Sequence, residues 1–497
     1  MAGMSYTYSD SRSVGATLEG TDPLKGYAEN FRYIDMDNGS GTKSFSGTSA
    51  PMQNTQISYF GRLSYTFDNR YSVQTNFRAD AFDSSKLSRK NRWGFFPSVS
   101  AGWTASNEGF IKDNISRDAL SFLKFRASWG VNGNIAVLND YAYSTTVSYN
   151  SKVYQWGVTD PTISHGSVPD GLANPDLKWE TSEQLDLGID ARFLRDRLTF
   201  GADWYNKQTK DLLMTVNPVL EVGAGSSVVN AGSIRNRGVE FEIGWRDTAG
   251  DFHYSVNANF AKLSNLVTYM TKQGMQRIPG EGFSNFKSST AFEEGYPVWY
   301  IRGFEYAGVS ADGKAQFLDA DGNITQTPSS ADLKCLGNSI PTYNYGITLR
   351  AEWKGIDFTF FGTGAGGNKI IPCVYRTEHP LINSLEYFHA NAGKTLPSCK
   401  EMASSTDFWS SSANLFDGDY FKIKQLQLGY SLPDNITRKI LLGGARFYVS
   451  LDDFFTFTKY PGFDPETASD GDYRGMGLDK GSYPNSRKVL LGVNISF

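Results

Sequence analysis

The chain ends in NSRKVLLGVNISF, residues 485–497, and the prediction of the fold starts from this stretch. Its alternate residues Val489, Leu491, Val493, Ile495 and Phe497 are all apolar. Because successive side chains of a β-strand point to opposite faces, these five share one face. The other face carries Leu490, Gly492, Asn494 and Ser496 and is mostly small or polar. The pattern predicts a strand with one face fit for lipid and one fit for water.

A strand that stops on an aromatic residue is typical of barrels in the bacterial outer membrane. An amphipathic strand of a soluble sandwich would show the same alternation, so this stretch alone leaves both interpretations open. The composition favours strands and tight turns: among 497 residues there are 50 Gly, 27 Tyr and 34 Phe, and only 20% are charged. The net charge of −4 gives no sign of a polyanion-binding protein, and we set nucleic acid aside.

The apolar runs are too short for a membrane helix, which needs roughly 18 consecutive apolar residues. A barrel exposes only every second residue to lipid, so a low mean hydropathy does not argue against a membrane barrel. The first residues, MAGMSYTYSDSRS, lack the basic and apolar regions of a signal peptide. We expect either no export or a true start farther upstream.

From residue 57 onward, alternating stretches recur with connections that are short and long in turn. This alternation of connection lengths is typical of an outer-membrane barrel with tight periplasmic turns and long outer loops. We predict an all-β transmembrane antiparallel barrel over residues 55–497, with about thirteen strands. Long outer loops are expected near residues 133–178, 270–340, 368–416 and 459–485. Residues 1–54 are polar and rich in Gly and Ser, and we expect them to form an extracellular loop region.

One predicted strand, LDLGIDARF, illustrates the two faces of the wall. Leu185, Leu187 and Ile189 alternate with the charged residues Asp186 and Asp190. A packed soluble core would not tolerate this row of charge, whereas a wet lumen would. An odd number of strands with both ends pointing the same way cannot close as an antiparallel barrel. The sequence therefore predicts part of a barrel.

Seven ordered segments carry a family resemblance: NPDLKWETSEQLDLGID, LTFGADWYNKQTKDLL, GSIRNRGVEFEI, LGNSIPTYNYGITLRAEWKGIDFTFF, DGDYFKIKQLQLGYSLP, FYVSLDDFFTFTKYPGFDPE and SYPNSRKVLLGVNISF. In this order and spacing they resemble the carboxy-terminal half of SusC/RagA-type TonB-dependent transporters of Bacteroidetes. The earlier segments WGFFPSVSAGW and FLKFRASWGVNGN resemble the preceding strands of that family.

The resemblance implies a 22-stranded barrel in the cell outer membrane, plugged by an amino-terminal domain and capped by a SusD-like lipoprotein. It further implies import of oligosaccharides or peptides with energy delivered by TonB. The plug, the TonB box and about nine strands are missing, so we expect a truncated or incompletely recovered chain. A secreted or surface glycan-binding or adhesion protein without transport is the alternative.

No enzyme chemistry and no cofactor are predicted. The stretch LDADGNIT places Asp319, Asp321 and Asn323 as in a calcium loop but lacks the glycine at its sixth position, which favours a solvated turn. No spacing selects a pair of carboxylates for hydrolysis. The expected ligand contacts are loop aromatics that could stack on sugars or peptide side chains: Tyr154, Trp156, Trp299, Tyr300 and Trp409. The apolar row of residues 489–497 is expected to be the barrel-assembly signal.

Overall fold

The structure is a computed structural model of the chain. It describes residues 1–19, 42–47, 52–83, 85–145, 147–157, 162–169, 171–216, 221, 225–271, 277–282, 287, 289–373, 386–469 and 471–497. The loops expected near 133–178, 270–340 and 368–416 therefore lie partly outside the described residues, as does much of the region 1–54.

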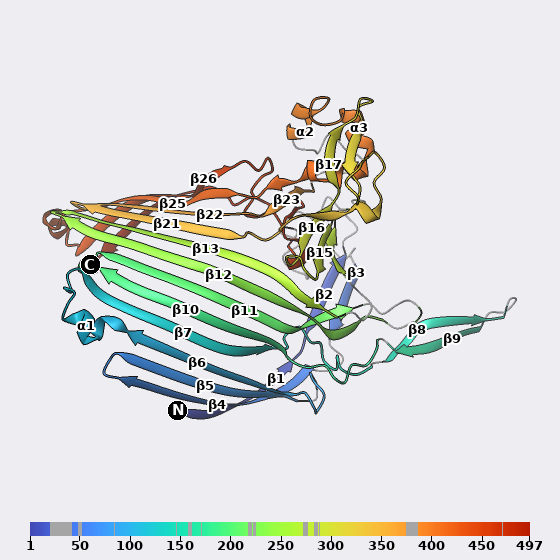
Figure 1. Cartoon of the computed structure of the whole chain (residues 1–497), viewed down its shortest axis with the longest axis horizontal. Coiled ribbons are helices and arrows are strands. Elements are labelled where there is room, and N and C mark those ends of the chain that lie inside the picture. The colour runs from blue at the N-terminus through green and yellow to red at the C-terminus, as the bar shows by residue number, and fades with distance from the viewer. Residues whose placement is uncertain are drawn as a thin grey trace.

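Fourteen antiparallel strands form one curved sheet in this part of the chain (Figure 1). Their order is β1 (Ala2–Ser11), β4 (Met52–Phe67), β5 (Tyr71–Phe82), β6 (Trp93–Thr104), β7 (Leu120–Asn134), β10 (Glu180–Phe193), β11 (Leu198–Val216), β12 (Ser227–Ala249), β13 (Phe252–Met270), β21 (Tyr343–Trp353), β22 (Ile356–Gly366), β25 (Tyr420–Ser431), β26 (Gly444–Thr458) and β28 (Lys488–Ser496). Neighbours in the sheet follow chain order, so the wall is an up-and-down meander.

The expected alternation of connections holds for most links but not for all: the link of residues 83–92 at the long-loop end is shorter than the link of residues 105–119 at the other end. Tight or short links join β4 to β5, β10 to β11, β12 to β13 and β21 to β22 at one end of the sheet, called here the short-turn end. Slightly longer links carry η1 (Ala105–Asn107) with α1 (Gly109–Lys112), and α5 (Asp434–Thr437) with η5 (Arg438–Ile440). The long excursions all leave from the opposite, long-loop end (Figure 1). The carboxy-terminus lies at the short-turn end, where the backbone of Gly443 approaches Phe497.

The expectation of a loop over residues 1–54 is wrong for Ala2–Ser11, which form β1. Hydrogen bonds of the antiparallel ladder pair this strand with β4, with Met4 opposite Tyr59 and Tyr6 opposite Ile57. The exposed side chains of Met4, Tyr6 and Tyr8 alternate with small polar residues, but this pattern is short and its partner strand lies about fifty residues later. The sheet therefore has fourteen strands where about thirteen were expected.

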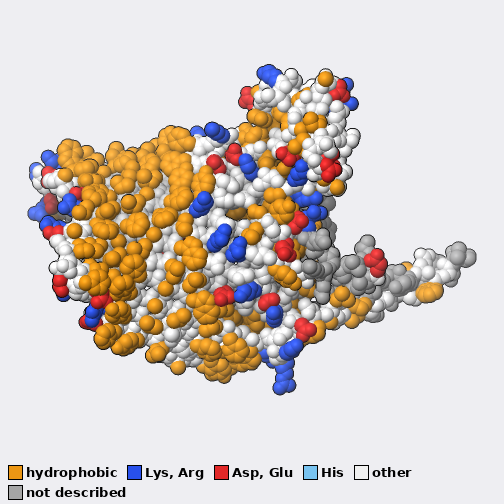
Figure 2. All heavy atoms as spheres, viewed as in Figure 1, with side chains coloured by type: hydrophobic (Ala, Val, Ile, Leu, Met, Phe, Trp, Pro, Cys, Tyr) orange, Lys and Arg blue, Asp and Glu red, His pale blue; other side chains and the backbone are white. Residues whose placement is uncertain are grey.

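The outer face of the sheet is covered by exposed apolar side chains. They form a band over the strands beside the short-turn end, with charged side chains concentrated beyond both of its edges (Figure 2). Exposed members include Leu63, Phe77, Leu187 and Leu428, which would be buried in a soluble protein. Strands β11, β12 and β13 have 19, 23 and 19 residues, whereas about 9–11 suffice to cross a membrane. These strands therefore continue well beyond the apolar band toward the long-loop end.

The long excursions fold into small sheets and short helices at the long-loop end (Figure 1). Two hairpins are β2 (Val14–Glu19) with β3 (Thr42–Gly47) and β8 (Val147–Trp156) with β9 (Thr162–Pro169). A four-stranded sheet contains β14 (Arg277–Gly282), β15 (Ser289–Glu293), β16 (Tyr300–Gly303) and β20 (Lys334–Gly337). Two three-stranded sheets contain β17 (Glu305–Val309), β18 (Ala315–Leu318) and β19 (Ile324–Thr325), and β24 (Phe416–Asp417), β23 (Lys369–Pro372) and β27 (Leu478–Asp479).

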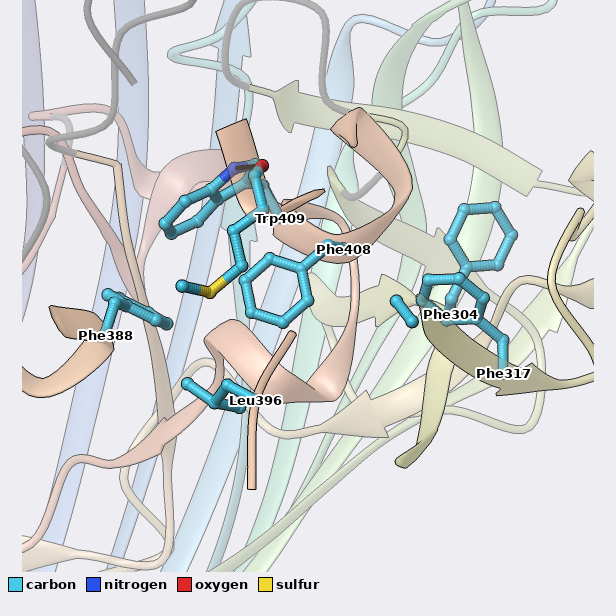
Figure 3. Packing of buried hydrophobic residues seen from close by; sticks show 8 residues of the cluster. Phe304, Phe317, Phe388, Leu396, Phe408 and Trp409 are labelled. Carbon is cyan, nitrogen blue, oxygen red and sulfur yellow. Dashed lines mark hydrogen bonds between the residues drawn. The ribbon is translucent and has the colours of Figure 1, made fainter. Parts of the chain in front are cut away.

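An outer lobe, formed by residues 304–333 and 386–416, projects from the long-loop end (Figure 1). It carries η3 (Ser330–Asp332), α2 (Glu386–Asn391), α3 (Cys399–Ser404), α4 (Thr406–Trp409) and η4 (Ser412–Asn414), while η6 (Tyr473–Gly475) lies in the last excursion. Its core joins two excursions that are distant in sequence (Figure 3): Phe304, Ala315, Phe317, Phe388, Leu396, Met402, Phe408 and Trp409. Each of these side chains is less than 10% exposed. The two excursions thus share one hydrophobic core.

Candidate functional site

The inner face of the sheet is lined by polar and charged side chains that pair across strands. Arg126 of β7 donates from Nε and Nη2 to Asp190 of β10, at 2.7 and 3.0 Å, and from Nη2 to Asp203 of β11 at 3.0 Å. All three side chains are between 32% and 39% exposed, so water reaches them. The expected luminal position of Asp190 is confirmed, and Leu187 on the same strand is 46% exposed on the opposite face.

A second luminal pair connects β26 to β22. Arg446 donates to both carboxylate oxygens of Asp357, at 2.8 and 2.5 Å, and its guanidinium lies 4.9 Å from the ring centroid of Tyr448. Such bidentate pairs fix the orientation of both side chains. At these two places, charged side chains on the inner face of the described wall are partly exposed and paired across strands.

A pocket of about 410 Å³ opens on this inner face near the long-loop end, between the ends of β4, β5, β6 and β7. Its apolar floor contains Phe82, Phe96 and Trp179. The Trp179 ring lies 5.3 Å from Phe96 in an edge-on arrangement and 5.8 Å from Phe82. The indole Nε1 donates to the Arg92 carbonyl at 3.2 Å, which fixes the ring.

Gly133 allows the floor of the pocket to form. A Cβ atom at this position would lie 2.2 Å from the Phe96 ring and 3.0 Å from the Trp179 ring. No real Cβ atom tolerates the first of these distances, so only glycine lets the Phe96 ring lie this close to β7. Phe96 and Trp179 continue into a buried cluster with Leu87 and Leu177, which makes the floor rigid.

The polar rim of the pocket combines paired ions with carboxamides. Arg78 donates from Nε to both oxygens of Asp80, at 2.9 and 2.7 Å, and from Nη2 to Ser58 at 3.0 Å. Lys86 lies 2.7 Å from Asp140. The rim also carries three carboxamides: Gln56, Asn132 and Asn134. This site was not predictable from the sequence, because its residues come from four strands and the loops beside them, which only the strand register brings together.

The predicted ligand-contact aromatics do not form one site. Trp156, at the end of β8, is 66% exposed, while the side chain of Tyr154 lies outside the described residues. Trp299, Tyr300 and Trp409 are 7%, 2% and 1% exposed. Such burial argues against ligand contact at these three positions, because their rings are occupied by packing within the loops.

Each of the three buried aromatics has a structural partner. Trp409 donates from Nε1 to the Met402 carbonyl at 2.8 Å inside the outer lobe (Figure 3). Tyr300 donates to Glu293 at 2.6 Å, and burial, followed by this hydrogen bond, raises the pKa of the Tyr300 phenol. Trp299 packs on Phe292, with ring centroids 5.5 Å apart.

A buried ion cluster anchors the last excursion to the wall. Lys422 of β25 is 1% exposed and lies 2.8 Å from Asp464 and 2.7 Å from Glu466. Lys424 bridges Glu466, at 2.7 Å, and Asp453, at 3.0 Å. Burial would raise the pKa of Glu466, but hydrogen bonds from Lys422 and then Lys424 outweigh it and lower the pKa.

The final strand, β28, extends the outer apolar face. Val489, Leu491, Val493, Ile495 and Phe497 are 51–97% exposed. Antiparallel pairing with β26 places Val493 opposite Phe447 and Leu491 opposite Val449, and paired residues share a face. The predicted face is therefore the one that continues the apolar band.

The acidic turn at residues 318–325 is organised by its own backbone. The Asp319 carboxylate accepts hydrogen bonds from the backbone N–H groups of Asp321 and Asn323, at 2.9 and 2.8 Å. These bonds lower the pKa of Asp319, led by the one from Asn323. The arrangement is that of a turn stabilised by its first side chain.

Comparison with known proteins agrees with this geometry. A family model described as TonB dependent receptor-like, beta-barrel, matches residues 2–437. The chain belongs to this family. TonB-dependent receptor P3 of Formosa agariphila is 31% identical over 475 residues, covering 89% of this chain and 45% of the relative. TonB-dependent receptor SusC of Bacteroides thetaiotaomicron is 29% identical over 467 residues, covering 90% and 44%.

A solved structure of the RagAB peptide transporter contains a chain that is 25% identical, with a TM-score of 0.75. The alignment covers 93% of this chain and 49% of that one. The chain thus spans about half the length of the proteins it matches. It is a TonB-dependent receptor barrel of the SusC/RagA type, located in the outer membrane. The described residues contain no helix that is both long and apolar enough to span a membrane.

Proposed function

We propose that the complete TonB-dependent receptor imports oligosaccharides or peptides together with a SusD-like surface lipoprotein. The observation that carries the proposal is the division of one wall into an exposed apolar outer face and a hydrated inner face with paired charges. A wall of this kind separates lipid from an aqueous passage. The names of the relatives SusC and RagAB peptide transporter support the same role.

The proposed protein is a passage and a docking surface and performs no covalent chemistry. Energy would come from TonB. The test is uptake of labelled neutral oligosaccharides and of labelled peptides by cells that carry or lack the complete gene, with and without a functional TonB complex. Uptake that is equal in all four strains would refute import.

The alternative of a secreted or surface adhesion protein is tested by fractionation of the complete protein. An outer-membrane barrel should be recovered with the membrane and should shift its gel mobility on boiling. A soluble protein with no mobility shift would support the alternative.

We also propose that the row Val489, Leu491, Val493, Ile495 and Phe497 is the assembly signal of the barrel. Its support is a regular exposed apolar row that ends on an aromatic residue. Deleting Phe497 should lower the amount of folded protein in the outer membrane, while Phe497→Tyr, which keeps an aromatic end, should not. Quantitative surface labelling measures both, and normal surface levels of the deletion variant would contradict the proposal.

A further inference from the structure

A groove of about 680 Å³ crosses the outer face of the wall over strands β5, β6, β7, β10, β11 and β12. Its outward-facing lining residues are all apolar or aromatic, and the remaining lining residues lie between them along each strand. The groove is continuous with the apolar band, which the lipid of the outer membrane surrounds (Figure 2). Lipid, rather than water, is therefore the medium that fills it.

A difference in side-chain size produces the groove. Ala101 and Ala127 lie opposite each other on β6 and β7. The next outward-facing pair toward the short-turn end is Trp103 and Phe125, whose stacked rings lie 5.5 Å apart. On the following strand, Leu187 lies opposite Ala127. The two alanines thus form a floor that larger side chains border.

The two ends of the groove lie at different depths in the wall. Tyr71 is the first residue of β5 and Trp103 the last but one of β6, so this end lies beside the short turns. Phe241, at the other end, lies eight residues before the end of β12. Cross-strand pairing connects the two ends in one row through Phe125, Ile189 and Ala202. Because barrel strands are tilted, this row descends from the short-turn edge into the apolar band.

Polar groups mark the shallow end of the groove. The Tyr71 hydroxyl and Trp103 Nε1, the latter at 3.0 Å, donate to the Glu108 carboxylate, and Arg70 Nη1 donates to it at 2.9 Å. These bonds orient the polar tips of both rings toward the short-turn end, as is usual for aromatic side chains at a membrane interface. A groove that is polar at its shallow end and apolar below matches an amphiphile with a hydrocarbon chain.

We propose that this groove binds one acyl chain of a phospholipid of the periplasmic leaflet, which stays with the receptor when the surrounding lipid exchanges. The leaflet follows from the position of the groove, since the short turns of outer-membrane barrels face the periplasm. A chain that lies on Ala101 and Ala127 makes the van der Waals contacts that an unfilled groove lacks. The proposal goes beyond the proposed import and does not depend on it.

Native mass spectrometry of the purified complete receptor tests this proposal. The receptor is released from nanodiscs that contain equal parts of phosphatidylethanolamine, phosphatidylglycerol and lipid A. We expect one phospholipid to remain bound after collisional activation has removed the other lipids. Ala127→Trp places a large ring on the floor of the groove and should lose this phospholipid. Ala202→Phe fills the deeper part and should lose it as well, and heat-modifiable mobility shows whether each variant has folded.

Ala258→Trp on β13 is the matched control. Ala258 lies opposite the exposed Ile243 on the same outer face but outside the groove, so this variant should keep the phospholipid. Retention of the phospholipid by either folded groove variant would overturn the proposal, as would retention of lipid A in its place or of no lipid. If Ala127→Trp separates a receptor dimer without changing the bound lipid, the groove instead binds a second copy of the chain.

Discussion

Apolar side chains are exposed on the outer face of the wall and buried in the outer lobe. On the wall, Leu187 and Leu428 are 46% and 51% exposed, and the polar residues face inward. In the lobe, Phe304 and Phe408 are 0% exposed at the centre of a core (Figure 3). The strands of the wall thus expose apolar side chains, as membrane proteins do. The lobe buries them, as soluble proteins do. The surroundings of each part, lipid or water, determine whether its apolar side chains are exposed or buried.

The largest loss of stability is expected when a large side chain is removed from the hydrophobic core of the outer lobe. Trp409→Ala removes a side chain that is 1% exposed and hydrogen-bonded to Met402. Such large-to-small changes in a core cost about 3–5 kcal/mol. Hydrogen exchange should therefore speed up in α2–α4, whereas exchange in the strands and heat-modifiable mobility should stay unchanged.

Trp353→Ala is the matched control, because this tryptophan is 50% exposed at the short-turn end of β21. It should leave exchange in the lobe unaltered. Equal acceleration by both variants would mean that the lobe does not fold as a separate core.

The second substitution places a charged side chain on the outer face of the wall. Leu187→Arg puts a cation on the outer apolar face in the middle of β10. Arginine near the bilayer midplane costs about 2–4 kcal/mol in a transmembrane barrel. The urea midpoint of unfolding in liposomes should fall accordingly.

Gln184→Arg makes the same change on the inner face of the same strand. Gln184 donates to Asp186 at 2.7 Å, so the new guanidinium would meet a carboxylate in water. Its unfolding midpoint should stay near that of the unmodified protein. Similar losses for the two variants would contradict the assignment of lipid and lumen faces.

The assignment of lipid and lumen faces was predictable from the sequence. In LDLGIDARF, the alternation already places Leu187 and Asp190 on opposite faces of the strand. It could not show that Trp299, Tyr300 and Trp409 are buried, because their neighbours come from distant parts of the excursions. The strand β1 was missed because its alternation covers only Met4, Tyr6 and Tyr8. The pocket was missed for a related reason: parity identifies Gln56 and Asn132 as luminal, but only the register places them together.

The smallest effect is expected in the hydrated charge network of the lumen. Arg126→Ala removes both ion pairs, to Asp190 and Asp203, yet all three groups are about a third exposed. Water and salt screen such pairs, which typically contribute about 0–1 kcal/mol each. The liposome unfolding midpoint should therefore drop only slightly, and the drop should shrink as ionic strength rises. A loss as large as that of Leu187→Arg, insensitive to salt, would mean that this part of the inner face is dry, and the division into a lipid side and a water side would no longer hold there.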